Sequence, residues 1–377
     1  MKLAKLNEIS VGGKGTYGIA ASAVDRCENL YTYLRITDIC DDGTLNRSGL
    51  KSVDDPDAAK YILKPNDIVF ARTGGSTGRN YFYDGSDGEF VYAGFLIKFS
   101  IDPEKANPKY IKYYCQSSQY KNWVRSFNTG STRGNINAQT FGNMEIPLPE
   151  RAQQDFLVDV LSPIDEKIKI NQQINDNLQQ QVYALFDSWF VSFDQTDGKM
   201  PADWREGTLG EITTITSGKR PPMKQPTATT EVSIPLVGAA SIMGFTNAVL
   251  YNEPILVTGR VGTHGVVQRF QSPCWTSDNT LVIKSEFYEY AFQALQRVDY
   301  VNMNRGSTQP LITQTDLKNV SIVIPTEAIL LEYEKIAGTL MAMYESNRKE
   351  NERLAVLRDT LLPRLMNGEI DVSNIEI

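Results

Sequence analysis

The sequence predicts two β-rich α/β domains, related by an internal duplication and separated by a long antiparallel two-helix coiled coil. Three observations lead to this fold class. The 377-residue chain repeats the pattern GST…IP at Gly130–Pro149 and Gly306–Pro325, at an offset of 176 (306 minus 130) and with identity at 7 of 20 positions. Short apolar runs broken by Gly and Asn precede each copy, and a long helical pattern follows it.

The first predicted domain covers residues 1–149. Its apolar runs YILKPNDIVFA and EFVYAGFLIKF are interrupted by Gly and Asn, as is typical of short strands. A helix is predicted where Asn107 precedes Pro108 in NPKYIKYYCQ, because Asn caps helix N-termini and Pro suits the first helical position. The domain is therefore mixed, with strands as its main element.

A helical spacer is predicted over residues 150–193. Gly and β-branched residues become sparse there, and Ser162 followed by Pro163 predicts the start of a coiled-coil helix over about 163–190. From that point, seam residues recur at alternating spacings of 4 and 3, the pattern of a coiled coil. The seam consists of Ile164, Ile168, Asn171, Asn175, Leu178, Val182, Leu185 and Trp189.

The seam recurs at the same offset of 176, in a second spacer over 326–377 with a coiled-coil helix over about 339–366. Both seams carry asparagine at the same places, which are Asn171, Asn175, Asn347 and Asn351. A seam asparagine penalises slipped registers, because it is buried satisfactorily only opposite a suitable partner. We therefore expect the two helices to pair. The alternative is that each helix packs only on its neighbouring domain.

A linker over residues 194–204 leads into the second predicted domain, over 205–325. LNEI at Leu6 recurs as LGEI at Leu209, an offset of 203, and DIVFARTGGSTG recurs as ILVTGRVGTHG, with Arg72 and Arg260 at an offset of 188. Because the offset falls from 203 to 176, the second copy is shorter by 27 positions (203 minus 176). Strands that are kept while loops differ indicate two copies of one fold that bind different targets.

Charge is distributed unevenly along the chain. The sequence holds 38 Lys and Arg against 45 Asp and Glu, a net charge of −7. The two domains are close to neutral, at +2 and +1, whereas residues 150–204 and 326–377 carry −6 and −4. The acidic total therefore does not exclude contact with nucleic acid by the domains.

Composition leaves little material for catalysis. His264 is the only histidine, which excludes multi-histidine metal sites and leaves little for a Ser-His-Asp relay. No apolar run reaches the roughly 18 residues that span a bilayer, so we expect a cytoplasmic protein. The cysteines are scattered without C-x-x-C spacing and are expected to be reduced and buried. They are Cys27, Cys40, Cys115 and Cys274.

Three motifs imitate catalytic signatures. ARTGGSTGRN lacks the lysine of a nucleotide-binding loop, so we expect Arg72 and Arg79 to contact a nucleic-acid backbone or groove. The alternative is a tight turn whose arginines are solvated. NPKY resembles the N-P-P-Y signature of adenine methyltransferases, but a helix start explains it better. DEK at Asp165–Lys167 lacks the upstream acidic partner of a nuclease site and is explained by a solvated helix face.

The ordered set of motifs resembles a known family. The two domains and two spacers, together with ALFDSWFVSF, MPADWREGTLGEI and LLPRLMNGEIDV, resemble the specificity (S) subunit of type I restriction-modification systems. The resemblance covers essentially the whole chain. It implies two target recognition domains, each reading one half of a split DNA site, held apart by the coiled coil. It also implies a subunit without catalytic activity.

The same resemblance implies the partners. They are double-stranded DNA, two methyltransferase (M) subunits that use S-adenosylmethionine, and ATP-dependent restriction (R) subunits recruited through M. No cofactor or metal is expected in this chain itself. One alternative is a divergent DNA adenine methyltransferase or nuclease that acts on its own, and another is a coiled-coil scaffold that binds proteins.

Loop residues at equivalent places in the two domains are the candidates for DNA contact. In the first domain they are Lys14, Thr16, Arg72, Thr73, Ser76, Arg79, Ser131, Thr132 and Arg133. In the second domain they are Lys219, Arg220, Arg260, Thr263, His264, Ser307, Thr308 and Gln309. The candidates for M-subunit contact are Phe186, Trp189, Phe190, Leu361, Leu365 and Met366. The alternative for this last set is that it only closes the core of the paired helices.

Overall fold

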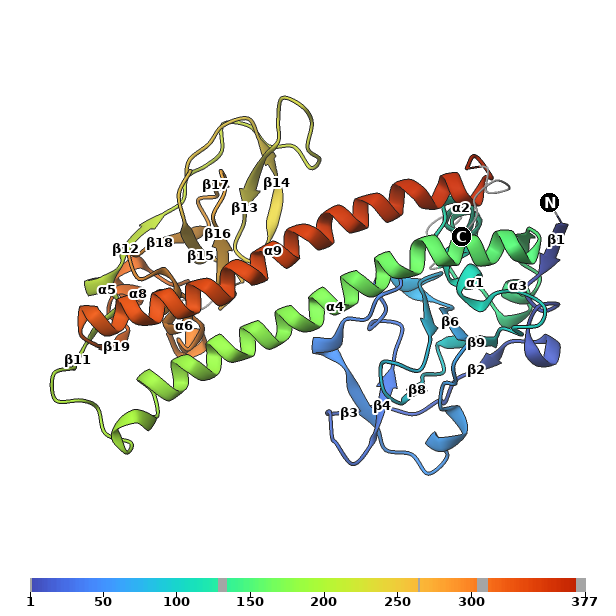
Figure 1. The fold of residues 1–377 in the computed structure, drawn as a ribbon, viewed down its shortest axis with the longest axis horizontal. Coiled ribbons are helices and arrows are strands. Elements are labelled where there is room, and N and C mark those ends of the chain that lie inside the picture. The colour runs from blue at the N-terminus through green and yellow to red at the C-terminus, as the bar shows by residue number, and fades with distance from the viewer. Residues whose placement is uncertain (1, 128–133, 264, 304–310, 371–377) are drawn as a thin grey trace. The chain divides into compact units, whose positions relative to one another are not determined.

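The computed structural model describes residues 2–127, 134–263, 265–303 and 311–370. The chain divides into two compact units. Unit 1 comprises residues 1–169 and 351–377, and unit 2 comprises residues 170–350. Each unit holds one of the two domains together with one segment from each of two 40-residue helices, α4 (Arg151–Phe190) and α9 (Glu327–Met366) (Figure 1).

Within its described residues, the domain of unit 1 is built from three small sheets. A two-stranded sheet pairs β1 (Lys2–Lys5) with β10 (Glu145–Leu148). A four-stranded antiparallel sheet has the order β2 (Thr16–Tyr17), β9 (Leu96–Ser100), β6 (Asp67–Ala71) and β7 (Asn80–Tyr83). A second sheet has the order β3 (Ala23–Val24), β5 (Lys51–Val53), β4 (Tyr31–Leu34) and β8 (Phe90–Tyr92), with β4 and β8 parallel.

The short helices of this domain are α1 (Pro108–Tyr114), α2 (Ser118–Arg125) and α3 (Ala138–Gly142). The side chain of Asn107 accepts from the backbone N–H of Lys109 and Tyr110, which confirms the predicted cap with Pro108 in the first turn. One core joins the strands, α1 and both long helices, and it includes Phe70, Tyr113, Leu161 and Leu362.

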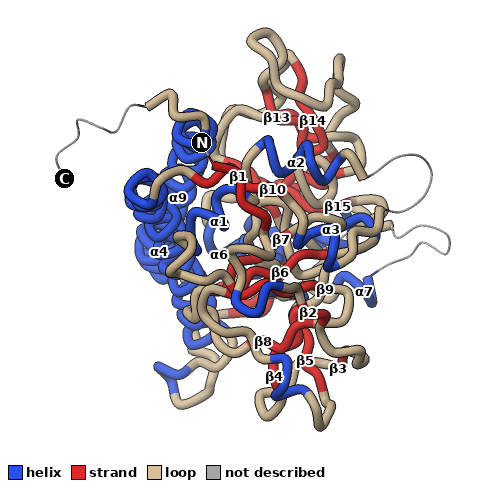
Figure 2. The backbone as a smooth tube through the Cα atoms, turned by 90° about the vertical axis from the view of Figure 1, so that its right-hand side faces the viewer, coloured by secondary structure: helices blue, strands red, loops and turns tan. Residues whose placement is uncertain are grey.

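The domain of unit 2 repeats this plan, with one strand fewer among the residues that the structure describes. β11 (Arg205–Thr208) pairs with β19 (Ser321–Ile324). The four-stranded sheet has the order β12 (Thr214–Ser217), β18 (Thr280–Lys284), β15 (Ile255–Gly259) and β16 (Gln268–Phe270). The third sheet has the order β14 (Ile242–Thr246), β13 (Ile234–Val237) and β17 (Trp275–Thr276). The strands are red in Figure 2.

The helices of this domain are α5 (Leu209–Ile212), α6 (Tyr288–Gln296), α7 (Tyr300–Met303) and α8 (Gln314–Lys318). Short 3-10 helices in the two units lie at Val11–Gly13, Arg47–Gly49, Ala58–Tyr61, Gly74–Ser76 and Asp194–Thr196. The core of unit 2 again includes both long helices, through Phe186, Phe190 and Tyr333, which surround Tyr290 of α6.

The strand registers confirm the duplication residue by residue. Lys2 lies opposite Leu148, and Arg205 lies opposite Ile324. These two pairs reproduce the offsets of 203 (205 minus 2) and 176 (324 minus 148) found in the sequence. The central strands β6 and β15 keep the offset of 188 over their whole length. The two domains are therefore copies of one fold, as the sequence predicts.

The long helices run antiparallel to each other within each unit. In unit 1 the amide of Asn351 in α9 donates to the carbonyl of Ile168 in α4, and Arg358 pairs with Asp165 at 3.3 Å. In unit 2, Asn171 donates to Glu350 at 2.7 Å. The helices thus contact each other as well as their domains, and the expectation of pairing is confirmed for each unit.

The predicted start of the first coiled-coil helix is wrong. The helix begins at Arg151, so Ser162 is not its cap, and Pro163 lies inside it. An internal proline removes one backbone hydrogen bond and usually ends a helix. Here Leu157 and Leu161, within the two preceding turns, are buried in the core of unit 1, and this packing outweighs the local preference. The second helix likewise begins at Glu327, before the predicted start at about 339.

Candidate nucleic-acid interface

Arg72 and Arg260 occupy the same place in the two domains, directly after the central strands β6 and β15. The N–H of Arg72 donates to the carbonyl of Phe95, and the N–H of Arg260 donates to that of Asn279, at 3.0 and 2.8 Å. The carbonyl of each arginine accepts from an isoleucine, Ile136 or Ile312, that lies just before a short helix, at 2.9 and 3.0 Å. The two arginines are thus held by one backbone framework.

The loop after Arg72 folds as a tight turn because its glycines permit it. Gly74 and Gly78 have φ values of +78° and +87°, which disfavour residues with a side chain. A Cβ on Gly78 would also lie 2.3 Å from a methyl carbon of Val124. The hydroxyl of Thr77 closes the turn by donating to the carbonyls of Gly74 and Gly134, at 2.8 and 2.9 Å.

The Arg72 side chain lies over an aromatic ring. Its guanidinium carbon is 5.2 Å from the ring centre of Tyr17, and the Tyr17 hydroxyl accepts from the N–H of Ala138 at 3.2 Å. Such a cation–π contact orients the guanidinium and lowers the entropy cost when a ligand binds. In the described part of the chain, neither Arg72 nor Arg260 forms an ion pair. Their charges are available for a polyanion.

Arg79 is engaged within the domain. It pairs with Asp41 at 2.6 Å and donates to the carbonyl of Ile39 at 3.1 Å. Ser76 is buried, and Thr73 is half-buried in a β-bridge with Asn135. For these three candidates the geometry supports the alternative of a structural turn, and their contact with DNA stays a prediction.

A close backbone crossing lies beside each arginine. The N–H of Gly18 donates to Leu96, and the N–H of Gly218 donates to Thr280, at 3.2 and 3.1 Å. A Cβ at either glycine would overlap a carbonyl oxygen, at 2.2 Å from that of Tyr92 and at 2.1 Å from that of Ser277. Only glycine fits both positions. Four candidates for DNA contact lie close in sequence to these glycines, and all four are exposed. They are Lys14, Thr16, Lys219 and Arg220.

The remaining candidates divide by whether the structure describes them. Thr263 is exposed in the loop after Arg260. Those outside the described residues are Ser131, Thr132, Arg133, His264, Ser307, Thr308 and Gln309. Sequence reasoning missed Tyr17, whose aromatic ring in a short strand gave no signal that it would stack on an arginine so distant in the chain.

The candidates for partner contact lie largely inside their own units. Phe186, Phe190 and Met366 are buried, and Leu361, Leu365 and Trp189 are half-buried against the same cores. Their burial supports the alternative that these side chains close the core. Among them, the half-buried residues retain surface that a partner could contact.

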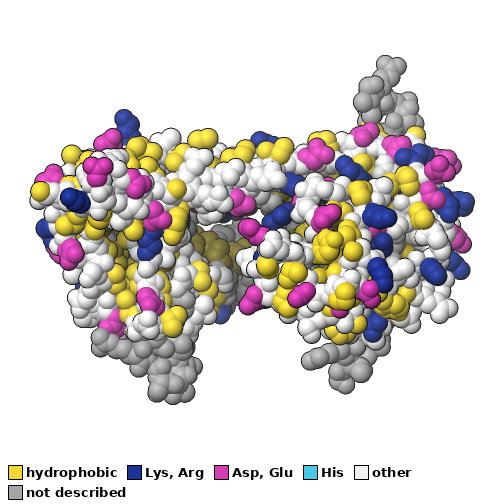
Figure 3. Space-filling model, turned by 90° about the horizontal axis from the view of Figure 1, so that it is seen from below, with side chains coloured by type: hydrophobic (Ala, Val, Ile, Leu, Met, Phe, Trp, Pro, Cys, Tyr) yellow, Lys and Arg dark blue, Asp and Glu magenta, His cyan; other side chains and the backbone are white. Residues whose placement is uncertain are grey.

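Surface and composition add three observations. On the face drawn in Figure 3, Lys and Arg side chains are interspersed with Asp and Glu side chains. Within the described residues, no group of three His, Cys, Asp or Glu is placed to hold a metal, and no helix is long and apolar enough to cross a membrane. Cys115 and Cys274 are buried as expected, but Cys27 is exposed and Cys40 half-buried, because both lie in loops.

Two copies of one fold, each with an arginine held by the same backbone framework, define a duplicated α/β protein that carries the same kind of loop surface twice. The chain belongs to the family described as type I restriction modification DNA specificity domain, whose sequence profile matches residues 29–180 and 201–358. DNA recognition within type I restriction-modification is therefore its class of function.

Individual relatives agree with this assignment. The chain is 23% identical over 303 residues to the type I restriction enzyme MjaIX specificity subunit of Methanocaldococcus jannaschii, covering 71% of this chain and 70% of that protein. It is 22% identical to the HindI specificity subunit of Haemophilus influenzae, covering 84% and 89%. The S subunit structure from M. genitalium has the same fold, with a TM-score of 0.60, 18% identity and 97% and 95% coverage.

Proposed function

We propose that this chain is the non-catalytic specificity subunit of a type I restriction-modification complex and reads a split DNA target, one half with each domain. The equivalence of Arg72 and Arg260 carries the proposal, because two identical frameworks hold two cations at one place while the surrounding loops differ. An arginine can donate two parallel hydrogen bonds to guanine or neutralise a phosphate, so both positions suit base or backbone contact.

The loops around these arginines support two different half-sites. The turn after Arg72 is built from glycine, serine and threonine, whereas Arg260 is followed by Val261, Gly262 and Thr263. Tyr17 underlies Arg72, and the equivalent residue beside Gly218 is Ser217, whose hydroxyl lies 2.9 Å from the side chain of Gln314. The two domains would therefore orient their arginines differently and prefer different bases.

The partners follow from the relatives, which are named as subunits of restriction enzymes. We propose that two M subunits, and R subunits through them, assemble on this chain in the cytoplasm. S-adenosylmethionine and ATP would be bound by those partners. Phosphate neutralisation dominates DNA affinity, and the domains carry little net charge. The M subunits would therefore supply much of the affinity for the duplex. The chain alone should bind DNA weakly.

A divergent methyltransferase or nuclease acting alone is less well supported. The NPKY segment caps α1 through Asn107, and Asp165 of the DEK segment is paired with Lys112 and Arg358. Both motifs therefore have structural explanations, although Asp165 is half-buried in ion pairs and does not lie on the solvated helix face that the sequence predicts. Binding of S-adenosylmethionine to the purified chain, or modification of DNA by it without a partner, would establish this alternative.

Mapping methylated adenines tests the proposal directly. Cells expressing this chain with its M partner should acquire methylation at one motif of two defined halves separated by unspecified bases. Arg72→Ala should relax or abolish recognition of one half, and Arg260→Ala that of the other. Arg353→Ala, an exposed arginine on α9, is the matched control and should leave the motif unchanged. A motif that neither domain variant alters would contradict the assignment of one half to each domain.

A further inference from the structure

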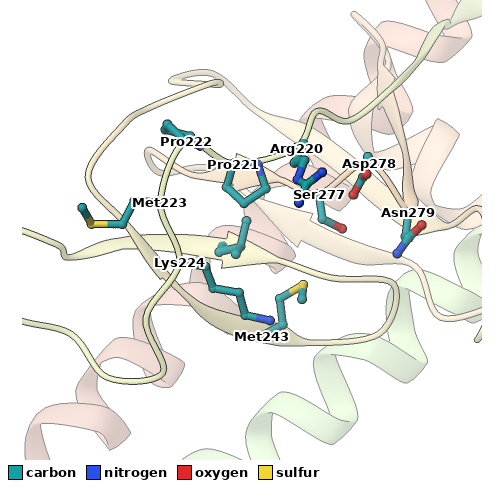
Figure 4. Close-up of a pocket in the computed structure, with 10 residues that line it drawn as sticks. Arg220, Pro221, Pro222, Met223, Lys224, Met243, Ser277, Asp278 and Asn279 are labelled. Atoms are coloured by element: carbon teal, nitrogen blue, oxygen red, sulfur yellow. The ribbon is translucent and has the colours of Figure 1, made fainter.

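A pocket of about 520 Å³ lies in the domain of unit 2. The loop before β13, two strands of the third sheet and the turn before β18 form its walls. Its lining residues are Arg220, Pro221, Pro222, Met223, Lys224, Leu236, Met243, Ser277, Asp278 and Asn279 (Figure 4). Lys224 and Met243 lie side by side on one wall, and Arg220, Ser277 and Asp278 are grouped on another.

The pocket adjoins the candidate DNA-contacting loop. Asn279, one of its lining residues, accepts the backbone hydrogen bond that positions Arg260, at 2.8 Å. On the other side, Lys219 precedes Arg220 and donates through its N–H to Thr276 at 2.9 Å. The pocket therefore lies beside the backbone that carries Arg260.

The first domain fills the equivalent place with a tyrosine. Ala93 donates to Leu34 and Ser277 donates to Val237 in matching positions, so Tyr33 of β4 corresponds to Leu236 of β13. The Tyr33 hydroxyl donates to the carbonyls of Ile19 and Ala21, at 3.0 and 2.9 Å. Leucine has no ring or hydroxyl that could reach across in this way. The Tyr33 side chain thus occupies, in the first domain, the place at which Leu236 lines the pocket of the second domain.

The lining combines three chemistries that a nucleotide requires. Arg220 and Lys224 form no ion pair in the described part of the chain and can contact a phosphate. Met223 and Met243 are 46% and 42% exposed and, with the prolines, offer apolar surface to a sugar or base. Asn279, which is exposed, can donate to and accept from a base edge.

We propose that this pocket binds one nucleotide of the second half of the DNA target, with Arg220 and Lys224 on its phosphate and Met243 against its sugar or base. The proposal rests on the proposed function and assigns the second domain an interaction that the first domain does not make. It predicts that the two halves of the target are held by different sets of side chains, with unequal shares of the affinity.

Two variants of the complete chain, each assembled with its M subunit, test the pocket. Leu236→Tyr should fill it as Tyr33 fills the first domain. Arg220→Gln with Lys224→Gln removes the charges at exposed positions, so folding is not at risk. Lys199→Gln, at an exposed position in the linker, is the control for removing a positive charge outside the pocket. Affinity for a fluorescent duplex bearing the mapped motif is measured by anisotropy over a series of salt concentrations.

Both pocket variants should weaken binding at least about tenfold, and the charge variant should flatten the dependence of log affinity on log salt by roughly one unit for each phosphate that no longer meets a cation. The control should match the original chain. If the original complex shows no sequence preference, the proposed function fails. If it binds its motif and both variants bind equally well, the pocket proposal alone is overturned. The chain could also bind free dAMP, and the pocket variants could abolish that binding without changing the affinity for the duplex. This result would overturn the proposal too, because the pocket would then bind a free nucleotide and not the DNA target.

Discussion

Asn347 of α9 donates a hydrogen bond of 3.0 Å to the side-chain oxygen of Asn175 of α4. Asn175 in turn donates to the backbone carbonyl of Tyr344 at 3.2 Å and is buried. The two side chains therefore form a polar link inside the helix pair of unit 2. The spacing of the sequence predicts that both residues lie on the coiled-coil seam. That they fix the register of the two helices stays a prediction.

Asn347→Ala should lower the free energy of unfolding by about 1–3 kcal/mol, because the buried oxygen of Asn175 then lacks its donor. Asn175→Leu with Asn347→Leu should recover most of this loss, since two apolar side chains need no partner. Urea denaturation of the three proteins measures both effects. A double variant less stable than the single one would show that the asparagines do more than satisfy each other.

Gly18→Ala should destabilise the first domain by about 1–3 kcal/mol, because the new methyl group would overlap the carbonyl of Tyr92 and force the backbone apart. Gly75→Ala is the matched control, since a Cβ there meets no atom within 4 Å. Thermal unfolding followed by circular dichroism compares the two. Equal melting temperatures would show that the backbone at Gly18 can move apart without a loss of stability.

Arg297, directly after α6, is expected to stabilise unit 2. It pairs with Asp187 of α4 at 2.7 Å and lies over the rings of Tyr183 and Phe186, at 3.9 and 4.4 Å. Arg297→Ala should therefore cost about 2 kcal/mol of stability, and Arg297→Lys should restore little, because an ammonium group cannot stack and bridge at once. Full recovery by lysine in a denaturation experiment would show that charge alone matters.

Glu334 predicts a pH dependence. Burial raises the pKa of its carboxyl to about 7, although it accepts from the N–H groups of Glu289 and Tyr290 and lies near Arg269. Because the folded pKa lies above the ordinary value of 4.5, the stability contributed by the protonated form is complete below pH 4.5 and is lost as the pH rises through 7.

Glu334→Gln keeps an acceptor for the two N–H groups but cannot ionise. Relative to this variant, the original protein should lose about 1–3 kcal/mol of stability between pH 4.5 and 8. Denaturation at a series of pH values measures the difference. Parallel stability curves would mean that Glu334 is ionised throughout and that solvent or Arg269 stabilises its charge.

The sequence alone was sufficient for the duplication, because strands repeat as patterns of identity and spacing that survive in registers such as Lys2 opposite Leu148. It also placed Arg72 and Arg260 correctly as equivalent positions of the two copies. It failed at Pro163, where a local rule predicted a helix start and tertiary packing of Leu161 decided otherwise.

Contacts between residues that are far apart along the chain could not be predicted from the sequence. The stacking of Tyr17 on Arg72 and the ion pair of Arg79 with Asp41 join side chains that are far apart along the chain. The pocket beside Arg220 is lined by Leu236, which corresponds to Tyr33 of the first copy, and only the matched backbone bonds reveal that correspondence. Loop offsets that change along the chain conceal it in the sequence.

The first and last strands of each domain pair with each other, β1 with β10 and β11 with β19. The chain therefore enters and leaves a domain at neighbouring points, and the polypeptide connects the domain to the rest of the chain only there. Such a domain can be exchanged as a cassette by two crossovers at these strands. An exchange at these strands would replace the strands and loops of one domain as a block, and the incoming block would have to fit the side chains of α4 and α9 that enter the same core.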